Sequence, residues 1–438
     1  MPTPPPTAAA RLRAIKRHVW LGHHGFLATC APGLEALVAE EVARLPNVAT
    51  VETRTGAVTF EAPFDTVYPA LLRLRIAESL RIIVARDLAA GSFPMLFDQL
   101  GRVRWALWLP DACTVTVRVR SSKSRLRDDE GLERTLRRAL HAAGVDAGSG
   151  GGDHGGAGGN AAGGGRSGAN LDVGRSGRAA DASPPITLHL HLHHDRASVT
   201  LDTGGALHRR QGDKWVSQTT IRETTAAALV RLAGVTDPLH EPDLLVDPFC
   251  GSGTLVIEAL DALFGAAAGR ARGTDALAVP LAASPAWKPE RWAHARRLFG
   301  GPGAHAETPV VLASDADPSA VRAADHNLAA LGYAERARTA VASAQSLDLG
   351  AIATERGARR PLLLTNPPYG RLTAARGAAP GELLRALLSR AEGWRFALLY
   401  PHPQDLEGLP NVELLEVRTI VTGGLRNAVL IGRVGGRR

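Results

Sequence analysis

The sequence predicts a doubly wound α/β domain that follows a mixed α+β region. From about residue 215, the short apolar runs LLVDPF, PVVLAS, LLLTN and FALLY alternate with helical patterns. Such continuous apolar runs are typical of parallel strands that helices cover on both faces. Upstream, CTVTVRVR alternates strictly and indicates a half-buried strand. We therefore expect a basic tail over residues 1–24, an α+β region over 25–205 and an α/β domain over 206–438.

The composition is that of a folded chain with several domains. The chain has 438 residues, of which 45% are hydrophobic, and this share excludes wholesale disorder. No window approaches the roughly 18 apolar residues of a membrane span, and the N-terminus shows no apolar signal core. Three distant cysteines, Cys30, Cys113 and Cys250, provide neither a disulfide framework nor a zinc-binding pair. We expect a reduced cytoplasmic location, and we expect no metal.

The charge balance is basic and has two explanations. The formal net charge of +8 suits a polyanionic partner such as a nucleic acid. Only 4 of the 51 basic residues are lysine, however, and alanine, glycine and arginine are used heavily. A GC-rich genome produces the same bias, so the charge alone does not identify a partner.

The α+β region shows strands and helices on both sides of an insertion. GFLATCAPGLEALVAEEVARL indicates a strand, a turn and an amphipathic helix, and AVTFEA indicates a further strand. A helix over DTVYPALLRLRIAES, the strand CTVTVRVR and a helix over EGLERTLRRALHAAG follow. After the insertion, PITLHLHLHHDRASVTLDT indicates two strands joined by a turn at Asp195-Arg196.

Glycine dominates the insertion, which we place at residues 147–184. Between Gly148 and Gly177, 14 of 30 residues are glycine. This stretch cannot bury enough surface to offset its ordering entropy, so we expect a flexible loop. The alternative is a glycine-rich segment that contacts RNA, for which the basic residues are Arg166, Arg175 and Arg178.

The first motif is a strand that ends in a glycine-rich turn. Residues Val246–Thr254 read VDPFCGSGT and continue into the helical LVIEALDAL. Glycine lets the backbone approach a ligand closely, and the free N–H groups of a helix N-terminus favour a carboxylate. No GK[ST] follows and the GxGxxG fingerprint is incomplete, so neither a Walker A loop nor a dinucleotide site is indicated. A tight turn without a ligand is the alternative.

The second motif is acidic and follows the strand PVVLA. Asp315 can accept hydrogen bonds from both ribose hydroxyls of a nucleoside cofactor. Asp317, followed by Pro318, is typical of an N-cap with proline at N1, and it would open a helix that ends near Gly332. Asp315 is therefore the better ligand candidate of the two acids.

The third motif, NPPYG over Asn366–Gly370, is the most specific. Two prolines cannot continue a central strand, and they fix a rigid turn at its carboxyl end, where doubly wound sheets bind ligands. The Asn366 side-chain carbonyl, the Pro367 backbone carbonyl and the Tyr369 ring then suit a planar ring that bears an exocyclic amine. A proline-rich turn with a core tyrosine is the alternative.

In this order, DPFCGSGT, SDADP and NPPYG resemble the class I S-adenosylmethionine-dependent methyltransferases that methylate amines. The segments GFLATCAPGLEALVAEEV, TGAVTFEA, ASVTLDTGGALHRR and IRETTAAALVRLAG resemble the THUMP-domain-containing RNA guanine-N2 methyltransferases of the bacterial 23S rRNA and tRNA type, as do WKPERW and GGLRNAVLIGR. The resemblance covers roughly residues 25–145 and 185–435. It implies a Rossmann-like methyltransferase domain behind a THUMP-like, ferredoxin-like region that binds RNA.

The resemblance implies a role for the residues of each motif. Those that would contact S-adenosylmethionine are Asp247, Phe249, Gly251, Gly253, Asp315, Ser343 and Asn366. Those that would hold the target base are Asn366, Pro367 and Tyr369. Ser343 follows Ala342 where the family often has Gly-Asp-Ala, so an acidic contact to adenine is missing and the affinity for the cofactor would be lower.

Basic side chains are expected to contact RNA phosphates. They are Arg118, Arg120, Lys123, Arg125, Arg209 and Arg210. A solvated strand face is the alternative for the first four, and ALHRRQGDKW departs from the family's Arg-Gly-Tyr-Arg in a turn expected to face RNA. His189, His191 and His193 alternate along one strand face, which favours a polar sheet face over a metal site.

The expected activity is methyl transfer from S-adenosylmethionine to an exocyclic amine of an RNA base, first of all guanine N2 in 23S rRNA. Guanine N2 of tRNA and adenine N6 of DNA remain alternatives, because an Asn-Pro-Pro-Tyr site accepts either amine. A non-catalytic RNA-binding assembly factor also remains, because Ala342-Ser343 replaces the acidic contact.

Overall fold

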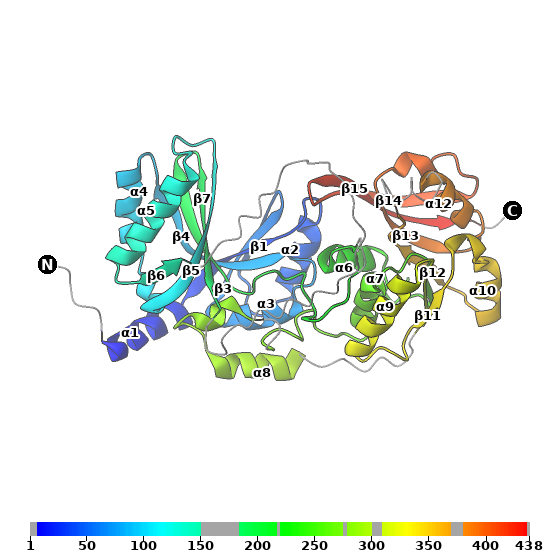
Figure 1. The fold of residues 1–438 in the computed structure, drawn as a ribbon, viewed down its shortest axis with the longest axis horizontal. Helices are drawn as coiled ribbons and strands as arrows, with labels where there is room; N and C mark the ends of the chain where they lie inside the picture. Colours follow the sequence, from blue (N-terminus) through cyan, green and yellow to red (C-terminus); the bar gives the residue numbers. More distant parts are fainter. Residues whose placement is uncertain are drawn as a thin grey trace, which may run out of the picture. The chain divides into compact units, whose positions relative to one another are not determined.

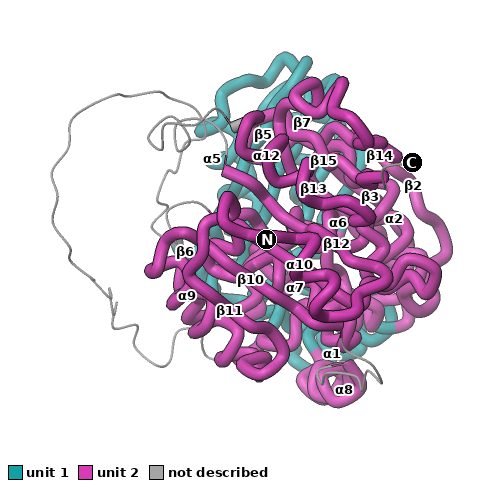
Figure 2. Tube along the Cα trace, turned by 90° about the vertical axis from the view of Figure 1, so that its right-hand side faces the viewer, with its two compact units in different colours: residues 1–20, 83–202, 280–287 teal, residues 21–82, 203–279, 288–438 magenta. Residues whose placement is uncertain are grey.

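The computed structural model describes residues 7–149, 184–216, 220–274, 278–299, 309–368 and 380–435. The chain divides into two compact units, coloured separately in Figure 2. Unit 1 holds Met1–Trp20, Ile83–Asp202 and Pro280–Trp287, and unit 2 holds Leu21–Ile82, Thr203–Val279 and Lys288–Arg438. This grouping cuts the α+β region expected over 25–205 at Ile82. From residue 150 to 183, the glycine-rich insertion lies outside the described residues.

Unit 2 contains a seven-stranded sheet with helices on both faces (Figure 1). Its strands are β9 (Leu244–Asp247), β10 (Val310–Asp315), β11 (Arg338–Val341), β12 (Pro361–Thr365), β13 (Arg395–Tyr400), β14 (Val412–Thr422) and β15 (Leu425–Val434). The helices in the same part of the chain, after residue 203, are α6 (Glu223–Leu232), α7 (Thr254–Leu263), α8 (Pro289–Phe299), α9 (Pro318–Ala330), α10 (Leu349–Arg356) and α12 (Pro380–Leu388). The short turns η5 (Ala344–Ser346) and η6 (Pro403–Leu406) also lie there.

The strand order places a topological switch point beside β9. The order is β11-β10-β9-β12-β13-β15-β14, with β9 to β13 parallel and β15 antiparallel to β13. The chain leaves β9 towards β10 on one side and later returns to β12 on the other. In such sheets the carboxyl ends of the strands at the switch point line the ligand crevice. The doubly wound α/β fold expected from the apolar runs is confirmed.

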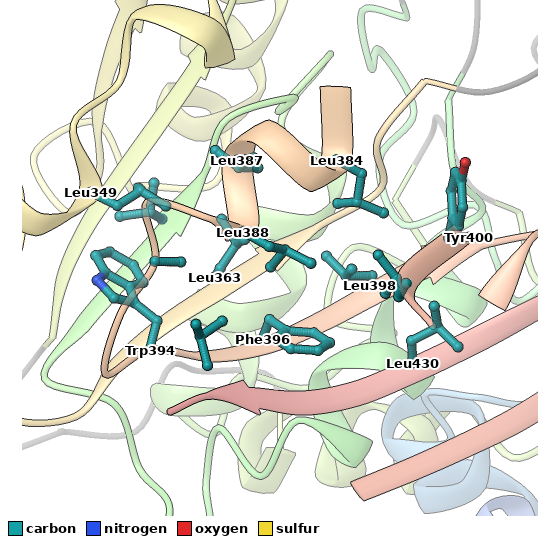
Figure 3. Packing of buried hydrophobic residues seen from close by; sticks show 14 of the residues in the cluster. Leu349, Leu363, Leu384, Leu387, Leu388, Trp394, Phe396, Leu398, Tyr400 and Leu430 are labelled. Atoms are coloured by element: carbon teal, nitrogen blue, oxygen red, sulfur yellow. The ribbon is translucent and has the colours of Figure 1, made fainter. Parts of the chain in front are cut away.

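The core of this sheet follows from the alternation of side chains along its strands. Leu363 of β12 and Phe396 of β13 enter one apolar cluster with the leucines of α12, which lie over these strands in Figure 3. The neighbouring Leu362 and Leu364 are equally buried, and by alternation they point to the opposite face. Burial on both faces explains why these strands are apolar without interruption.

Unit 2 also contains the N-terminal strands and helices. They are β1 (His23–Thr29), α2 (Glu35–Ala43), β2 (Thr50–Arg54), β3 (Ala57–Pro63), η2 (Phe64–Thr66), α3 (Val67–Arg73) and the first residues of β4 (Ser79–Ala89). The strands pair antiparallel in the order β2-β3-β1-β4. The expected helix over DTVYPALLRLRIAES is shorter than predicted. It ends at Arg73 because the backbone N–H groups of Arg75 and Ile76 donate to the Glu41 carboxylate.

Unit 1 pairs its strands in the order β4-β8-β7-β5-β6. Its remaining elements are α1 (Ala8–Ile15), η1 (Lys16–Trp20), α4 (Phe93–Gly101), η3 (Trp105–Leu107), β5 (Ala112–Ser122), α5 (Asp129–Ala142), β6 (Asp146–Ser149), β7 (Ile186–His193), β8 (Arg196–Asp202) and η4 (Pro280–Ala283). The turn between β7 and β8 consists of His194 and Asp195, both with positive φ, because Arg196 already pairs with His193. The predicted turn at Asp195-Arg196 is therefore one residue late.

No helix among the described residues is long and apolar enough to cross a membrane.

Candidate functional site

A cavity of about 340 Å³ lies where β9, β10 and β12 end. Its lining includes five of the residues expected to bind the cofactor: Asp247, Phe249, Gly251, Asp315 and Asn366. Three separate motifs of the sequence are thus brought to one place, as the switch point requires. The volume is in the range of pockets that take small molecules.

Asp247 is the most deeply buried acid in this cavity. It ends β9 and is 1% exposed. The hydroxyl of Thr365, at the end of β12, donates to Asp247 Oδ1 at 2.6 Å, and the Phe249 N–H donates to the same oxygen at 3.1 Å. The pKa of Asp247 is raised to about 7, and burial is the largest cause. The two hydrogen bonds lower this pKa, and the nearby charge of Asp315 raises it. The carboxyl group therefore titrates close to neutral pH.

The glycine-rich turn has a backbone that requires glycine. Gly251 and Gly253 have φ of 53° and 81°, in the left-handed region. A Cβ on Gly253 would lie 3.2 Å from the Cβ of Ala324 on α9, so the turn also packs tightly against that helix. Gly253 is the N-cap of α7 but does not line the cavity, whereas Gly251 and Ser252 do. The hydroxyl oxygen of Ser252 is buried and has no hydrogen-bond partner among the described residues.

Asp315 holds the two loops of the cavity together. Its Oδ2 accepts from the Gly251 N–H at 3.1 Å and its Oδ1 accepts from the Asp317 N–H at 3.0 Å. Each carboxylate oxygen can accept a further hydrogen bond, so contacts to a ribose remain available. Asp317 is the N-cap of α9, as predicted, because its side chain accepts from the Ser319 N–H at 2.8 Å. Asp317 also lines the cavity.

Asn366 presents an acceptor without a partner. It follows β12 directly, and its Oδ1 atom is buried with no hydrogen-bond donor among the described residues. A buried amide oxygen that stays unsatisfied costs free energy, of about 1–3 kcal/mol. Because Asn366 lines the cavity, a ligand that brings a donor there would remove this cost. Pro368 also lines the cavity, Pro367 is buried outside the lining, and Tyr369 lies outside the described residues.

Two of the sequence-predicted residues have other uses. Ser343 is the N-cap of η5, where its hydroxyl accepts from the Gln345 N–H at 3.3 Å, and it does not line the cavity. Arg210 is 6% exposed, and its guanidinium donates to Glu258 and to two backbone carbonyls of unit 2. Arg210 therefore stabilises the interior of unit 2, and the prediction that it contacts RNA was wrong. Arg209 beside it is exposed.

The predicted RNA-binding side chains of unit 1 lie along β5 and the loop after it. Arg118 and Arg120 are exposed and pair in register with His189 and His191 of β7. On β7 the alternate leucines are buried, so these histidines belong to a polar sheet face, as expected. Lys123 is exposed, and Arg125 forms an ion pair with Asp195 at 2.8 Å.

Another wall of the cavity was not predicted from the sequence. Val216, Thr220 and Ile221 line it, and none of them was among the expected site residues, although Ile221 begins the segment IRETTAAALVRLAG. The segment of residues 211–216 is anchored by Lys214, whose ammonium donates to Glu223 at 2.5 Å and to the Thr254 hydroxyl at 2.8 Å. An ammonium on a side chain that is only 11% exposed needs such a partner, but the sequence offered no signal for the pairing.

Two segments of the chain match models of known protein families. Residues 210–402 match the RMKL-like methyltransferase domain, and residues 25–82 match the RlmL ferredoxin-like domain. The second match ends at Ile82, where the two compact units divide.

One similar curated protein is the ribosomal RNA large subunit methyltransferase K/L of Syntrophotalea carbinolica. It is 29% identical over 395 residues, which are 86% of this chain and 49% of that protein. The chain thus spans about half of the length of this relative.

Two solved structures share the fold. SMU.472 complexed with SAH superposes with a TM-score of 0.74 at 20% identity, covering 95% of this chain and 99% of that one. A "predicted N6-adenine-specific DNA methylase" from Listeria monocytogenes gives a TM-score of 0.73 at 23% identity, covering 95% and 97%.

Proposed function

We propose, from the premise that the chain belongs to the RMKL-like methyltransferase family over residues 210–402, that it transfers a methyl group from S-adenosylmethionine to an exocyclic amine of an RNA base. The observation that carries this proposal is the unpartnered Oδ1 of Asn366 in the cavity formed by Asp247, Gly251 and Asp315. The cavity brings a group that can bind an amine next to a turn that can bind the methyl donor.

The described residues fit S-adenosylmethionine in four respects. Gly251, with positive φ and no side chain, leaves the backbone of the turn open to a ligand. Asp247 offers a carboxylate to the ammonium group of the methionine part, and Asp315 offers acceptors to the ribose hydroxyls. Ser252 adds a buried hydroxyl without a partner. When bound, the cofactor supplies a methyl group that is activated by the sulfonium, and the sulfur serves as the leaving group.

The chain's part in the reaction is to position the amine. The exocyclic nitrogen of guanine is a poor nucleophile because its lone pair is delocalised into the ring. A hydrogen bond from this amine to Asn366 Oδ1, and a second to the Pro367 carbonyl, would favour a pyramidal nitrogen aimed at the methyl group. Holding two reactants in line at about 3 Å can lower the barrier by roughly 7–11 kcal/mol. We assign no general base, since the proton can leave to water after transfer.

Guanine N2 in large-subunit ribosomal RNA is the substrate that we propose. The ferredoxin-like match over residues 25–82 and the name of the Syntrophotalea relative support RNA, and the latter supports ribosomal RNA. The target base must leave its stack to reach the cavity, at a cost of a few kcal/mol that is smaller in loops and at ends. We further propose that five exposed residues contact the RNA backbone: Arg118, Arg120, Lys123, Arg125 and Arg209. We also propose a cytoplasmic location.

The experiment that tests the proposal replaces Asn366. Asn366→Ala should lower methyl transfer to ribosomal RNA by on the order of 10²–10³-fold, as loss of one aligned polar contact does in other active sites. Its affinity for S-adenosylmethionine, measured by calorimetry, should stay within about twofold to threefold. Asn427→Ala is the matched control, because Asn427 is also a buried amide but lies on β15, away from the cavity. An Asn366→Ala protein that transfers methyl groups at the full rate would refute the role.

Adenine N6 is the competing target, because the amide of Asn366 accepts a hydrogen bond from either amine. Labelled cofactor offered in parallel to purified rRNA, tRNA and duplex DNA separates these substrates. A failure to bind S-adenosylmethionine at all would favour the non-catalytic assembly factor.

A further inference from the structure

An exposed tryptophan stands beside the cavity on a firmly held segment. Trp215 is 53% exposed, and the next residue, Val216, lines the cavity. One face of the indole stacks on the His326 ring of α9, with the ring centroids 4.1 Å apart and the planes 13° apart. An indole left half in water forgoes the free energy that its burial would release. Its exposure therefore needs a reason.

The backbone of Trp215 is fixed by one buried amide. The Trp215 N–H donates to Asn327 Oδ1 at 2.9 Å, and Asn327 Nδ2 donates to the Trp215 carbonyl at 2.8 Å. The same Nδ2 donates to the carbonyl of Ser252, which lines the cavity, at 2.9 Å. Asn327 thus ties the tryptophan and the glycine-rich turn to one point on α9. A rigid aromatic ring loses little conformational entropy when a ligand packs on it.

The surroundings of the ring suit an RNA strand. Arg322 lies four residues before His326 on α9, so both side chains are on the same helix face. Arg322 is exposed and has no ion-pair partner among the residues that the structure describes. An exposed guanidinium one helical turn from the His326 ring on which the indole stacks can bind a phosphate while a base stacks on the indole.

We propose that Trp215 is a stacking platform for an unpaired RNA base that neighbours the target nucleotide. This proposal rests on the proposed function, because it assumes that the substrate is RNA. A base flipped into the cavity leaves its neighbours with one open face. The free face of Trp215 replaces the lost stacking partner, and Arg322 holds the adjoining phosphate. Trp215 is therefore an RNA-positioning residue and takes no part in methyl transfer itself.

The test compares stacking with plain apolar packing. Trp215→Phe keeps an aromatic face and Trp215→Leu does not, while both can cover His326. Each is assayed with a short single-stranded oligoribonucleotide and with the same oligonucleotide made abasic, by fluorescence anisotropy in the presence of S-adenosylhomocysteine. Leu425→Ala, which removes another exposed apolar side chain of unit 2, is the control. Calorimetry of S-adenosylmethionine checks the cavity in every variant.

Trp215→Leu should weaken binding of the normal oligonucleotide by about fivefold to a hundredfold, the range of one base stacked on an aromatic ring. Binding of the abasic oligonucleotide and of the cofactor should change by less than about twofold, and Trp215→Phe should retain most of the affinity. Equal losses in the Phe and Leu variants, equal losses for both oligonucleotides, or no loss at all would overturn the proposal. A wild-type protein that shows the base-dependent binding but methylates no RNA would instead refute the proposed function.

Discussion

Asp247 makes cofactor binding depend on pH near neutrality. Burial raises its pKa to about 7, so about one tenth of the carboxyl groups are ionised at pH 6 and about nine tenths at pH 8. If the ionised form holds the ammonium group of S-adenosylmethionine, its affinity should rise about tenfold over this range. The cause is a single carboxyl group, so the dependence should follow one titration centred near pH 7.

The assay is calorimetry or equilibrium dialysis of S-adenosylmethionine across this range. Asp247→Asn is the control, because its amide cannot ionise while the cofactor's own amine still titrates. The variant should bind more weakly at pH 8 and lose the rise seen in the wild type. An affinity of the wild type that does not change between pH 6 and pH 8, or a rise of equal size in Asp247→Asn, would refute the reasoning.

The free energy of unfolding should depend on the ionisation of Asp247 in the opposite direction to cofactor affinity. The folded pKa of Asp247 lies above its unfolded value of 3.8, so its contribution to the free energy of unfolding should fall as the pH rises from about 4 to 7, in denaturant titrations compared with Asp247→Asn. Arg210→Met should lower the free energy of unfolding by roughly 3–5 kcal/mol, because it leaves the fully buried Glu258 without one of its two arginines. Arg433→Met, in the exposed pair with Glu413, should lower it by at most about 1 kcal/mol. Equal losses in the two variants would contradict the buried network. Deleting residues 150–177 should leave folding and activity nearly unchanged. The end of β6 and the start of β7 pair with the same residue of β5, Val115, from its two sides, so the shortened loop must bridge only about 10 Å. A loss of folding or of activity would show that the insertion has a function.

The sequence was most informative where local chemistry decides the structure. The apolar runs became the parallel strands β9, β10, β12 and β13, because burial on both faces requires an unbroken apolar pattern. The N-cap at Asp317 and the glycine turn at Gly251 were also predictable, since each depends on the backbone conformation of a few neighbouring residues. The motifs met at one cavity because the switch point collects the carboxyl ends of these strands.

Contacts between distant residues could not be predicted in this way. Arg210 looked like a surface arginine in HRRQ, but it is buried because Glu258, 48 residues later, accepts from its guanidinium. Trp215 ends the segment ALHRRQGDKW, and nothing in that segment indicates that its position depends on Asn327, 112 residues away. The helix before β4 ends early because Glu41, from another helix, binds the backbone of Arg75 and Ile76. Pairings of this kind leave no local trace in the sequence.

The central claim is that the Asn366 amide receives a purine amine beside the bound methyl donor. Nucleoside mass spectrometry of ribosomal RNA, treated with this protein and isotopically labelled S-adenosylmethionine, tests it most directly. We predict that the label is recovered as N2-methylguanosine and disappears when Asn366→Ala replaces the wild type. Label found on a ribose oxygen or on a ring carbon would contradict the claim, because neither position offers an amine to the Asn366 oxygen.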